Sequence, residues 1–342
     1  MKKYLVFIGM LIVQNNVALV DITLKYVNDS FATRSVNAVI LTHLGAGFFA
    51  EFGKVISSLI HYELDGIRSM YVDWTDQFFP FKDKPYENGW DLYFEPVIIE
   101  ESIDPSEPVY EVGNCSVHEL HDQLCVAQWI RYDDYLPYRL FVHEKINQHI
   151  HIKKHISDEV DSFYKKYMQD NVCIGVHVRY AKAHVNETPN GHPSLDTYCK
   201  EVNDLLKRHS ADKVKIFLAS DSHVVINHFK RLYKEKLIYI DTYRATAKED
   251  PGLIYENSNY WITHPDHWHK AKPGYQGGLG ALMDCLLLAK CDYLIHITSN
   301  VSTYVCFFNP YIKSIYLPRK VPFKHCRYRG DKSIRNKFLN PI

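Results

Sequence analysis

The sequence predicts an α/β protein made of two facing Rossmann-like domains with a cleft between them. Three observations predict this. The chain has 342 residues, more than the roughly 250 to 300 at which a single hydrophobic core stops growing. Its second half alternates short apolar runs with helical patterns, as βαβ units do. Its first half contains one similar unit, so each half is expected to form its own parallel sheet.

Composition is that of an ordinary globular protein. Hydrophobic residues make up 46% of the chain and charged residues 23%, which excludes bulk disorder. Lys plus Arg and Asp plus Glu both number 40, so no overall basic field exists to attract nucleic acid. We therefore expect no nucleic-acid partner.

The N-terminus resembles a targeting segment. Two lysines precede an apolar run over residues 4–13, followed by short and polar residues. This order predicts a signal peptide over residues 1–20, with a plain N-terminal strand as the alternative. About ten apolar residues are too few to span a bilayer comfortably. We expect a protein of the secretory pathway lumen (Golgi or ER) or an exported one, membrane-bound only if the segment is not cleaved.

The first domain is expected over residues 21–165. An apolar run at 36–41 predicts a strand, and the pattern over 48–64 predicts a helix with one apolar side. A second strand is expected at 70–72. The aromatic stretch 73–96 lacks either periodicity, so it is interpreted as a long loop that is functional or covers the core.

The second domain is expected over residues 166–320, followed by a tail at 321–342, with the charged stretch 153–170 as the connection between the halves. The expected strands are 172–179, 214–219, 237–240, 293–298 and 314–317, and the expected helices are 195–207, 224–233, 279–289 and 302–308. Strands that alternate with helices in this way favour a parallel sheet.

Polar side chains follow three of these strands. His177 and Arg179 share one face at the end of the first strand, because side chains alternate with a period of two. Asp221 ends the second strand, and Ser299-Asn300 lies between a later strand and a helix. Ligands of parallel α/β sheets bind beyond the carboxyl ends of the strands. A guanidinium, a carboxylate and a helix start together predict a nucleotide-diphosphate pocket.

Each of these residues also has a purely structural interpretation. Ser299 and Asp221 can cap the helices that follow them, and Arg179 can pair with a structural carboxylate. What favours the pocket is their coincidence at three strand ends. The chain contains no GxxxxGK[ST] and no GxGxxG after its first strand, which disfavours ATPases of the Walker type and standard dinucleotide binding.

Cysteines and histidines give weaker signals. The eight cysteines form no C-x-x-C pair, so no zinc ribbon is expected. Cys173, Cys285 and Cys291 lie in apolar patterns and are expected to be buried, whereas Cys115 and Cys125 could form a disulfide. The His-rich stretch 263–269 could bind a metal, contact a ligand, or be a plain surface loop.

Several motifs resemble one enzyme superfamily. The segment IGVHVR at 174–179, followed by Glu187 and by His-Pro at 192–193, resembles the signature of the α1,6-, bacterial Nod-factor and protein O-fucosyltransferases. The resemblance extends to FLASDS at 217–222 and to the block 279–308. It covers about 150 residues of the second half.

The resemblance implies an inverting glycosyltransferase of the GT-B fold. Such an enzyme takes fucose from GDP-fucose, without a metal, and transfers it to a hydroxyl of a glycan or glycoprotein. By position Arg179 matches a β-phosphate ligand, and Glu187 matches the catalytic base, with His184 as the alternative. The positions that match nucleotide contacts are His177, Asp221, Asp284, Ser299 and Asn300.

The sequence also departs from that pattern. Tyr180 stands where the relatives carry a second arginine, Ala183 where they carry a lysine, and Tyr304 where they carry an arginine. These changes leave two alternatives open. One is a catalytically weakened relative that binds a carbohydrate or nucleotide sugar, and the other is a transferase that uses a different nucleotide sugar.

Overall fold

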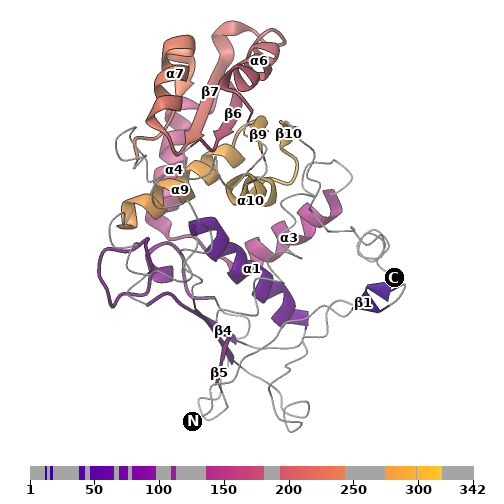
Figure 1. The fold of residues 1–342 in the computed structure, drawn as a ribbon, viewed down its shortest axis with the longest axis vertical. Helices are drawn as coiled ribbons and strands as arrows, with labels where there is room; N and C mark the ends of the chain where they lie inside the picture. The colour runs from indigo at the N-terminus through magenta and orange to yellow at the C-terminus, as the bar shows by residue number, and fades with distance from the viewer. Residues whose placement is uncertain are drawn as a thin grey trace.

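The structure is a computed structural model. It describes residues 12–13, 16–17, 38–42, 47–64, 69–75, 79–97, 109–112, 136–180, 193–242, 274–297 and 299–317. These residues form an α/β fold with two parallel sheets, at opposite ends of the long axis in Figure 1. The predicted fold class is confirmed at this level.

The larger sheet lies in the second half of the chain and has five parallel strands in the order β10-β9-β6-β7-β8. Its strands are β6 (Val172–Val178), β7 (Val214–Ser220), β8 (Leu237–Ile238), β9 (Tyr293–His296) and β10 (Lys313–Tyr316). All five were predicted, with ends that differ by one or two residues.

Helices cover both faces of this sheet. On one face, α6 (Leu195–Leu206) and α7 (His223–Tyr233) share a buried cluster with alternate residues of β6, including Ile174 and Val176. On the other, α9 (Gly274–Ala289) contacts β6 and β7, and α4 (Lys154–Tyr167) contacts α9. Gly175 faces this second layer, where an added Cβ would lie 3.0 Å from Leu288 Cδ2 and from the Tyr293 carbonyl. Its lack of a side chain therefore allows β6 to pack closely.

The smaller sheet belongs to the first half. It has the order β4-β3-β5, with β3 (Ala38–Thr42), β4 (Ser69–Asp73) and β5 (Val109–Val112) all parallel. Helix α1 (Phe48–Leu64) connects β3 to β4, as predicted. The aromatic stretch after β4 is mostly irregular, with the short 3-10 helix η1 at Trp90–Leu92.

The described chain also contains four shorter elements. The 3-10 helices η3 (Ala211–Lys213) and η4 (Lys234–Lys236) precede β7 and β8. Near the N-terminus, β1 (Ile12–Val13) and β2 (Asn16–Val17) form a two-residue antiparallel pair within the predicted signal peptide.

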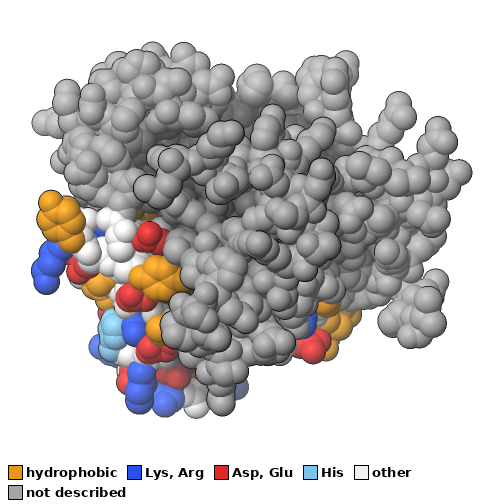
Figure 2. Space-filling model, turned by 90° about the horizontal axis from the view of Figure 1, so that it is seen from below, with side chains coloured by type: hydrophobic (Ala, Val, Ile, Leu, Met, Phe, Trp, Pro, Cys, Tyr) orange, Lys and Arg blue, Asp and Glu red, His pale blue; other side chains and the backbone are white. Residues whose placement is uncertain are grey.

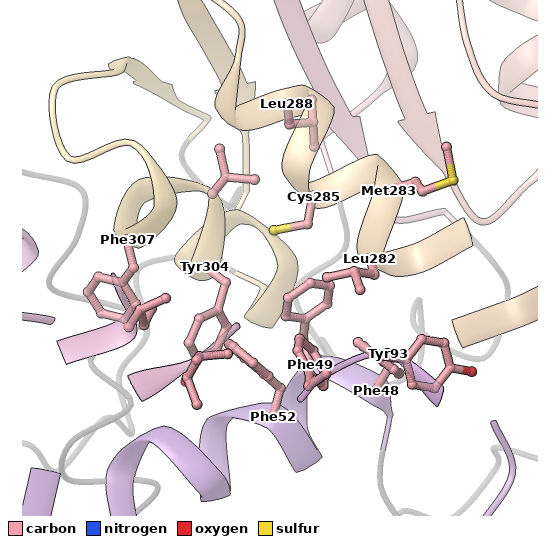
Figure 3. Packing of buried hydrophobic residues seen from close by; sticks show 14 of the residues in the cluster. Phe48, Phe49, Phe52, Tyr93, Leu282, Met283, Cys285, Leu288, Tyr304 and Phe307 are labelled. Carbon is pink, nitrogen blue, oxygen red and sulfur yellow. The ribbon is translucent and has the colours of Figure 1, made fainter. Parts of the chain in front are cut away.

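One apolar core joins the first half of the chain to the second. Phe48, Phe49 and Phe52 of α1 belong to the same buried cluster as residues of α9 and of α10 (Asn300–Phe308). Figure 3 shows the α1 rings facing Leu282 on α9 and Tyr304 on α10. Phe49 stacks on Tyr304 at a centroid distance of 5.6 Å. The helices of the two halves therefore pack directly on one another.

Two features of the helices were not predicted. The charged stretch expected to connect the halves is largely helix α4, whose buried Ile156 and Val160 are spaced four apart. It follows another helix, α3 (Leu136–His149), which contacts α10. Helix α9 begins five residues before the predicted start at 279, because its glycine-rich first turns pack closely against other segments.

Charged side chains are mixed on the surface. Figure 2 shows acidic and basic side chains interspersed on the described part of the face in view. Several form close pairs, such as Lys154 with Asp158 at 2.7 Å on α4. Among the residues that the structure describes, no helix is long and apolar enough to cross a membrane.

Candidate functional site

The strand order creates a switch point beside β6. The chain runs outward from β6 through β7 to β8, then returns to the other side of β6 as β9 and continues to β10. Connections that leave a parallel sheet in opposite directions open a crevice at the carboxyl ends of the two strands. The candidate site is therefore the carboxyl edge of β6 and β9, with β7 beside it.

A hydrogen bond bridges this switch point. Ser299 Oγ lies 3.2 Å from His177 Nδ1. His177 is the penultimate residue of β6, and Ser299 follows β9 and caps α10. Both are buried, with exposed fractions of 7% and 5%. Two predicted site residues separated by 122 positions are thus brought into direct contact.

Ser299 belongs to a small buried cluster of hydrogen-bonding side chains. The Ile297 carbonyl can only accept, so the Ser302 hydroxyl donates to it at 2.7 Å. Ser302 Oγ also lies 2.9 Å from Ser299 Oγ, which in turn contacts His177 Nδ1. The His177 ring is therefore held at the switch point through its Nδ1 atom.

The start of α10 is held by a reciprocal cap. Ser299 Oγ accepts from the Ser302 N–H, and Ser302 Oγ accepts from the Ser299 N–H, both at 3.1 Å. The Ser299 carbonyl accepts from the Thr303 N–H at 3.0 Å. Asn300, partly exposed, opens the helix at the positive end of its dipole. The predicted capping role of Ser299 is confirmed, and the helix start is ordered where an anion can bind.

Arg179 and Asp221 lie at the same edge. The β6–β7 ladder ends at the pair Val178 and Ser220, so the next residues leave the sheet side by side. Asp221 Oδ1 accepts from the Tyr180 N–H at 2.8 Å. The carboxylate therefore binds the backbone directly after Arg179, a contact that the sequence did not predict.

The remaining predicted residues are less closely placed. Asp284 is buried in α9, with an exposed fraction of 8%. Glu187 and His184 lie outside the described residues, as do the His-rich stretch 263–269 and the Cys115–Cys125 pair. Within the part of the chain that the structure describes, no group of three or more His, Cys, Asp or Glu side chains could hold a metal ion.

Three buried cysteines lie in the second half of the chain and do not belong to the site. Cys173, Cys285 and Cys291 are buried and free, as predicted. Burial raises the pKa of the Cys173 thiol to about 12 and that of Cys285 well above its usual range. These thiols are therefore protonated and unreactive at neutral pH.

Two residues gain a structural explanation. Tyr304 stands where the superfamily that this sequence resembles carries an arginine. Its side chain is buried between α1 and α10, and its ring centroid lies 5.0 Å from that of Phe52. Ser302, which sequence reasoning missed, completes the α10 cap. A serine three residues after an N-cap serine was the available signal, although glutamate or glutamine is the usual partner.

Comparison with known proteins gives consistent matches. The model of the family described as nodulation protein Z (NodZ) matches residues 140–329. The nodulation protein Z of Azorhizobium caulinodans is 26% identical over 152 residues, which are 43% of this chain and 41% of that protein. The match thus spans about two fifths of that relative's length.

Solved structures are similar at lower identity. A NodZ α-1,6-fucosyltransferase soaked with GDP-fucose is 21% identical, with a TM-score of 0.46 over 80% of this chain and 93% of that one. The apo form of POFUT1 is 10% identical, with a TM-score of 0.44 over 83% of this chain and 99% of that one. Because the family model covers more than half of the 342 residues, this chain belongs to the nodulation protein Z family.

Proposed function

We propose that this protein is an inverting glycosyltransferase that transfers fucose from GDP-fucose to a hydroxyl of a glycan or glycoprotein. Its family includes a nodulation protein Z, and one similar structure is a NodZ α-1,6-fucosyltransferase soaked with GDP-fucose. The observation that carries the proposal is the contact between His177 and Ser299, 3.2 Å apart across the switch point. It joins the strand that bears Arg179 to an ordered helix start.

In this reaction the acceptor hydroxyl attacks the anomeric carbon while the GDP β-phosphate leaves with growing negative charge. Arg179 binds that phosphate as a two-pronged donor. Ser299 and Asn300 add the positive end of α10. A fixed cation acting where charge develops contributes about 3 to 4 kcal/mol, or roughly 100- to 1000-fold in rate, by analogy with oxyanion-hole donors.

The nucleoside and the acceptor are assigned to other residues. His177 and Asp284 bind the guanine nucleoside. Glu187, with His184 as the alternative, accepts the proton of the attacking hydroxyl. Replacing Glu187 by Gln should leave GDP binding nearly unchanged and slow transfer by about 100- to 10,000-fold, the usual contribution of a positioned base.

The proposed reaction needs no metal cofactor. The chain has no Asp-x-Asp motif, and Arg179 with the α10 start supplies the positive charge that a bound cation would otherwise bring.

The finer architecture we propose is GT-B, with the acceptor side in residues 21–165 and the donor side in 166–320. A signal peptide at 1–20 directs the protein to the secretory pathway or to export.

A donor panel tests this function. Transfer to a mixed glycan acceptor pool is measured with GDP-fucose, GDP-mannose, UDP-glucose and UDP-N-acetylglucosamine, each with and without EDTA. We expect transfer from GDP-fucose alone, at the same rate in EDTA. Transfer from a UDP sugar would refute the donor assignment, and loss in EDTA with recovery in manganese would refute the metal-free mechanism.

One observation favours a second candidate, a carbohydrate-binding or nucleotide-sugar-binding relative with weakened catalysis. Tyr304 fills the core between α1 and α10, so it offers no cation to the donor. Tyr180 and Ala183 likewise replace cations of the resembling pattern. GDP binding without fucose transfer, in the same panel, would support this candidate.

A further inference from the structure

Beyond its sheet, β6 continues through a side-chain hydrogen bond. The parallel ladder with β7 ends at Val178 and Ser220. Asp221 directly follows Ser220, and its Oδ1 accepts a hydrogen bond from the Tyr180 N–H at 2.8 Å. The Asp221 carboxylate thus adds one more hydrogen bond to the chain of β6 after its backbone pairing with β7 has ended. This bond lies at the edge of the sheet where the site is.

Tyr180 is also held by its ring. It is partly buried against the apolar cluster of α6 and α7, on the same face as Val176 and Val178. Alternation places Arg179 on the opposite face, with His177. His177 is itself fixed through Ser299 Oγ. Arg179 therefore lies between two residues whose positions are set by hydrogen bonds to neighbouring segments.

We propose that Asp221 is a positioning residue, which orients Arg179 toward the nucleotide diphosphate by holding the Tyr180 backbone. This proposal rests on the proposed function, because it requires that a nucleotide diphosphate binds beside Arg179. The proposal differs from base recognition, in which the Asp221 carboxylate would accept hydrogen from guanine. A positioning role predicts equal effects on every nucleoside diphosphate, whereas base recognition predicts an effect on guanine alone.

The chain provides a matched control at the other end of the same strand. Asp292 Oδ2 accepts the Cys173 N–H, also at 2.8 Å, near the amino-terminal end of β6. The chemistry and the distance are the same, but Arg179 lies at the opposite edge. Loss of Asp292 should therefore destabilise β6 without disturbing the site.

The test is calorimetric titration of GDP and UDP, in parallel, into the full chain and its variants. Asp221→Ala should weaken whichever diphosphate the parent binds by about 10- to 100-fold, because a misdirected Arg179 loses most of its charge-assisted contact with the phosphate. Asp221→Asn should stay within about threefold of the parent, because its amide oxygen can still accept from Tyr180. Asp292→Ala should lower Tm and leave both affinities unchanged.

A second background tests whether Asp221 acts through Arg179. In Arg179→Ala, adding Asp221→Ala should weaken binding less than about threefold further, since coupled residues are not additive. Amide hydrogen exchange at Tyr180 should accelerate in Asp221→Ala and not in Asp221→Asn, whether or not the protein transfers fucose.

The inference would be overturned if Asp221→Asn bound the diphosphate as weakly as Asp221→Ala, or if the losses of affinity in Asp221→Ala and Arg179→Ala were additive. It would also be overturned if Asp292→Ala lost as much affinity as Asp221→Ala, or if the parent bound neither GDP nor UDP. A parent that binds UDP and not GDP would refute the proposed donor. The Asp221 effect, measured on UDP, would then still decide the positioning role.

Discussion

At the scale of single residues, Arg179 is the group on which the proposed chemistry depends most. It lies two residues after His177 and directly before Tyr180, and both of these residues are hydrogen-bonded to other segments at the sheet edge. A guanidinium held in this way can form two parallel bonds to a phosphate, which an ammonium cannot.

Replacing Arg179 should therefore weaken GDP binding as well as transfer. A charge-assisted contact contributes about 1.5 to 3 kcal/mol, so Arg179→Ala should lower GDP affinity by about 10- to 150-fold in calorimetry, and Arg179→Lys should recover only part of it. Arg208, exposed just after α6, is the control arginine, and Arg208→Ala should bind like the parent. Unchanged affinity in Arg179→Ala would remove Arg179 from the site.

A second residue prediction concerns Lys54, which is fully buried in α1. Burial lowers its pKa from 10.5 to about 8, and nearby Glu51 limits the fall by favouring the charged form. Below pH 8 the ammonium is protonated in both the folded and unfolded states. Between pH 8 and 10.5 only the unfolded state keeps the proton, so this group makes the fold more stable as pH rises.

The measurement compares the parent with the double variant Glu51→Gln/Lys54→Met in denaturant unfolding from pH 7 to 9.5. The free energy of unfolding of the parent, relative to the variant, should rise above pH 8 by up to about 1.4 kcal/mol per pH unit. Buried thiols such as Cys173, whose pKa is raised, act in the opposite direction but are common to both proteins. A difference that stays constant with pH would contradict the account.

Residue types at strand ends predicted much of the site, but not how its members interact. His177 and Ser299 were both expected, because each follows or ends an apolar run. The Asp221 bond to Tyr180 could not be predicted, since its partner is a backbone N–H whose direction depends on where the ladder stops. Lys54 could not be predicted either, because a lysine within an amphipathic helix usually reaches solvent.

At the scale of elements, the cap of α10 connects stability to the site. Ser299→Ala removes the acceptor for the Ser302 N–H and the partner of His177. We expect the free energy of unfolding to fall by about 1 kcal/mol, as for other N-caps, and GDP binding to weaken with it. Ser194 caps α6 through the Thr197 N–H, and Ser194→Ala should lose similar stability with no change in GDP affinity. Equal GDP affinities in both variants would show that α10 does not contribute.

Elements with strong apolar periodicity were predicted well, and those fixed by tertiary contacts were not. Helix α1 has the predicted bounds because its buried residues repeat at helical spacing. Helix α9 starts at Gly274 despite the low helix propensity of glycine. A Cβ at Gly278 would collide with the Tyr93 hydroxyl, which donates to the Phe81 and Tyr275 carbonyls. Close packing against the aromatic stretch therefore outweighs propensity there.

At the scale of the whole molecule, the apolar core shared by the two halves of the chain supports the helix that begins at the site. The aromatic rings of α1 pack on α9 and α10, and α10 carries Ser299 at its start. The strand order of the larger sheet then puts the switch point, and with it the candidate site, at the carboxyl ends of β6 and β9. Sequence patterns predicted two parallel sheets, but alternation of strands and helices does not specify which strands are neighbours.

The central claim is that a guanine nucleotide binds at this carboxyl edge. Hydrogen–deuterium exchange of the full chain, with and without GDP and in the presence of EDTA, tests it most directly. We predict slower exchange in peptides covering 177–180, 221–224 and 299–303, and unchanged exchange near 172–173 and 290–292 at the opposite edge. Protection confined to the smaller sheet, or to the amino-terminal ends of the larger one, would contradict the account.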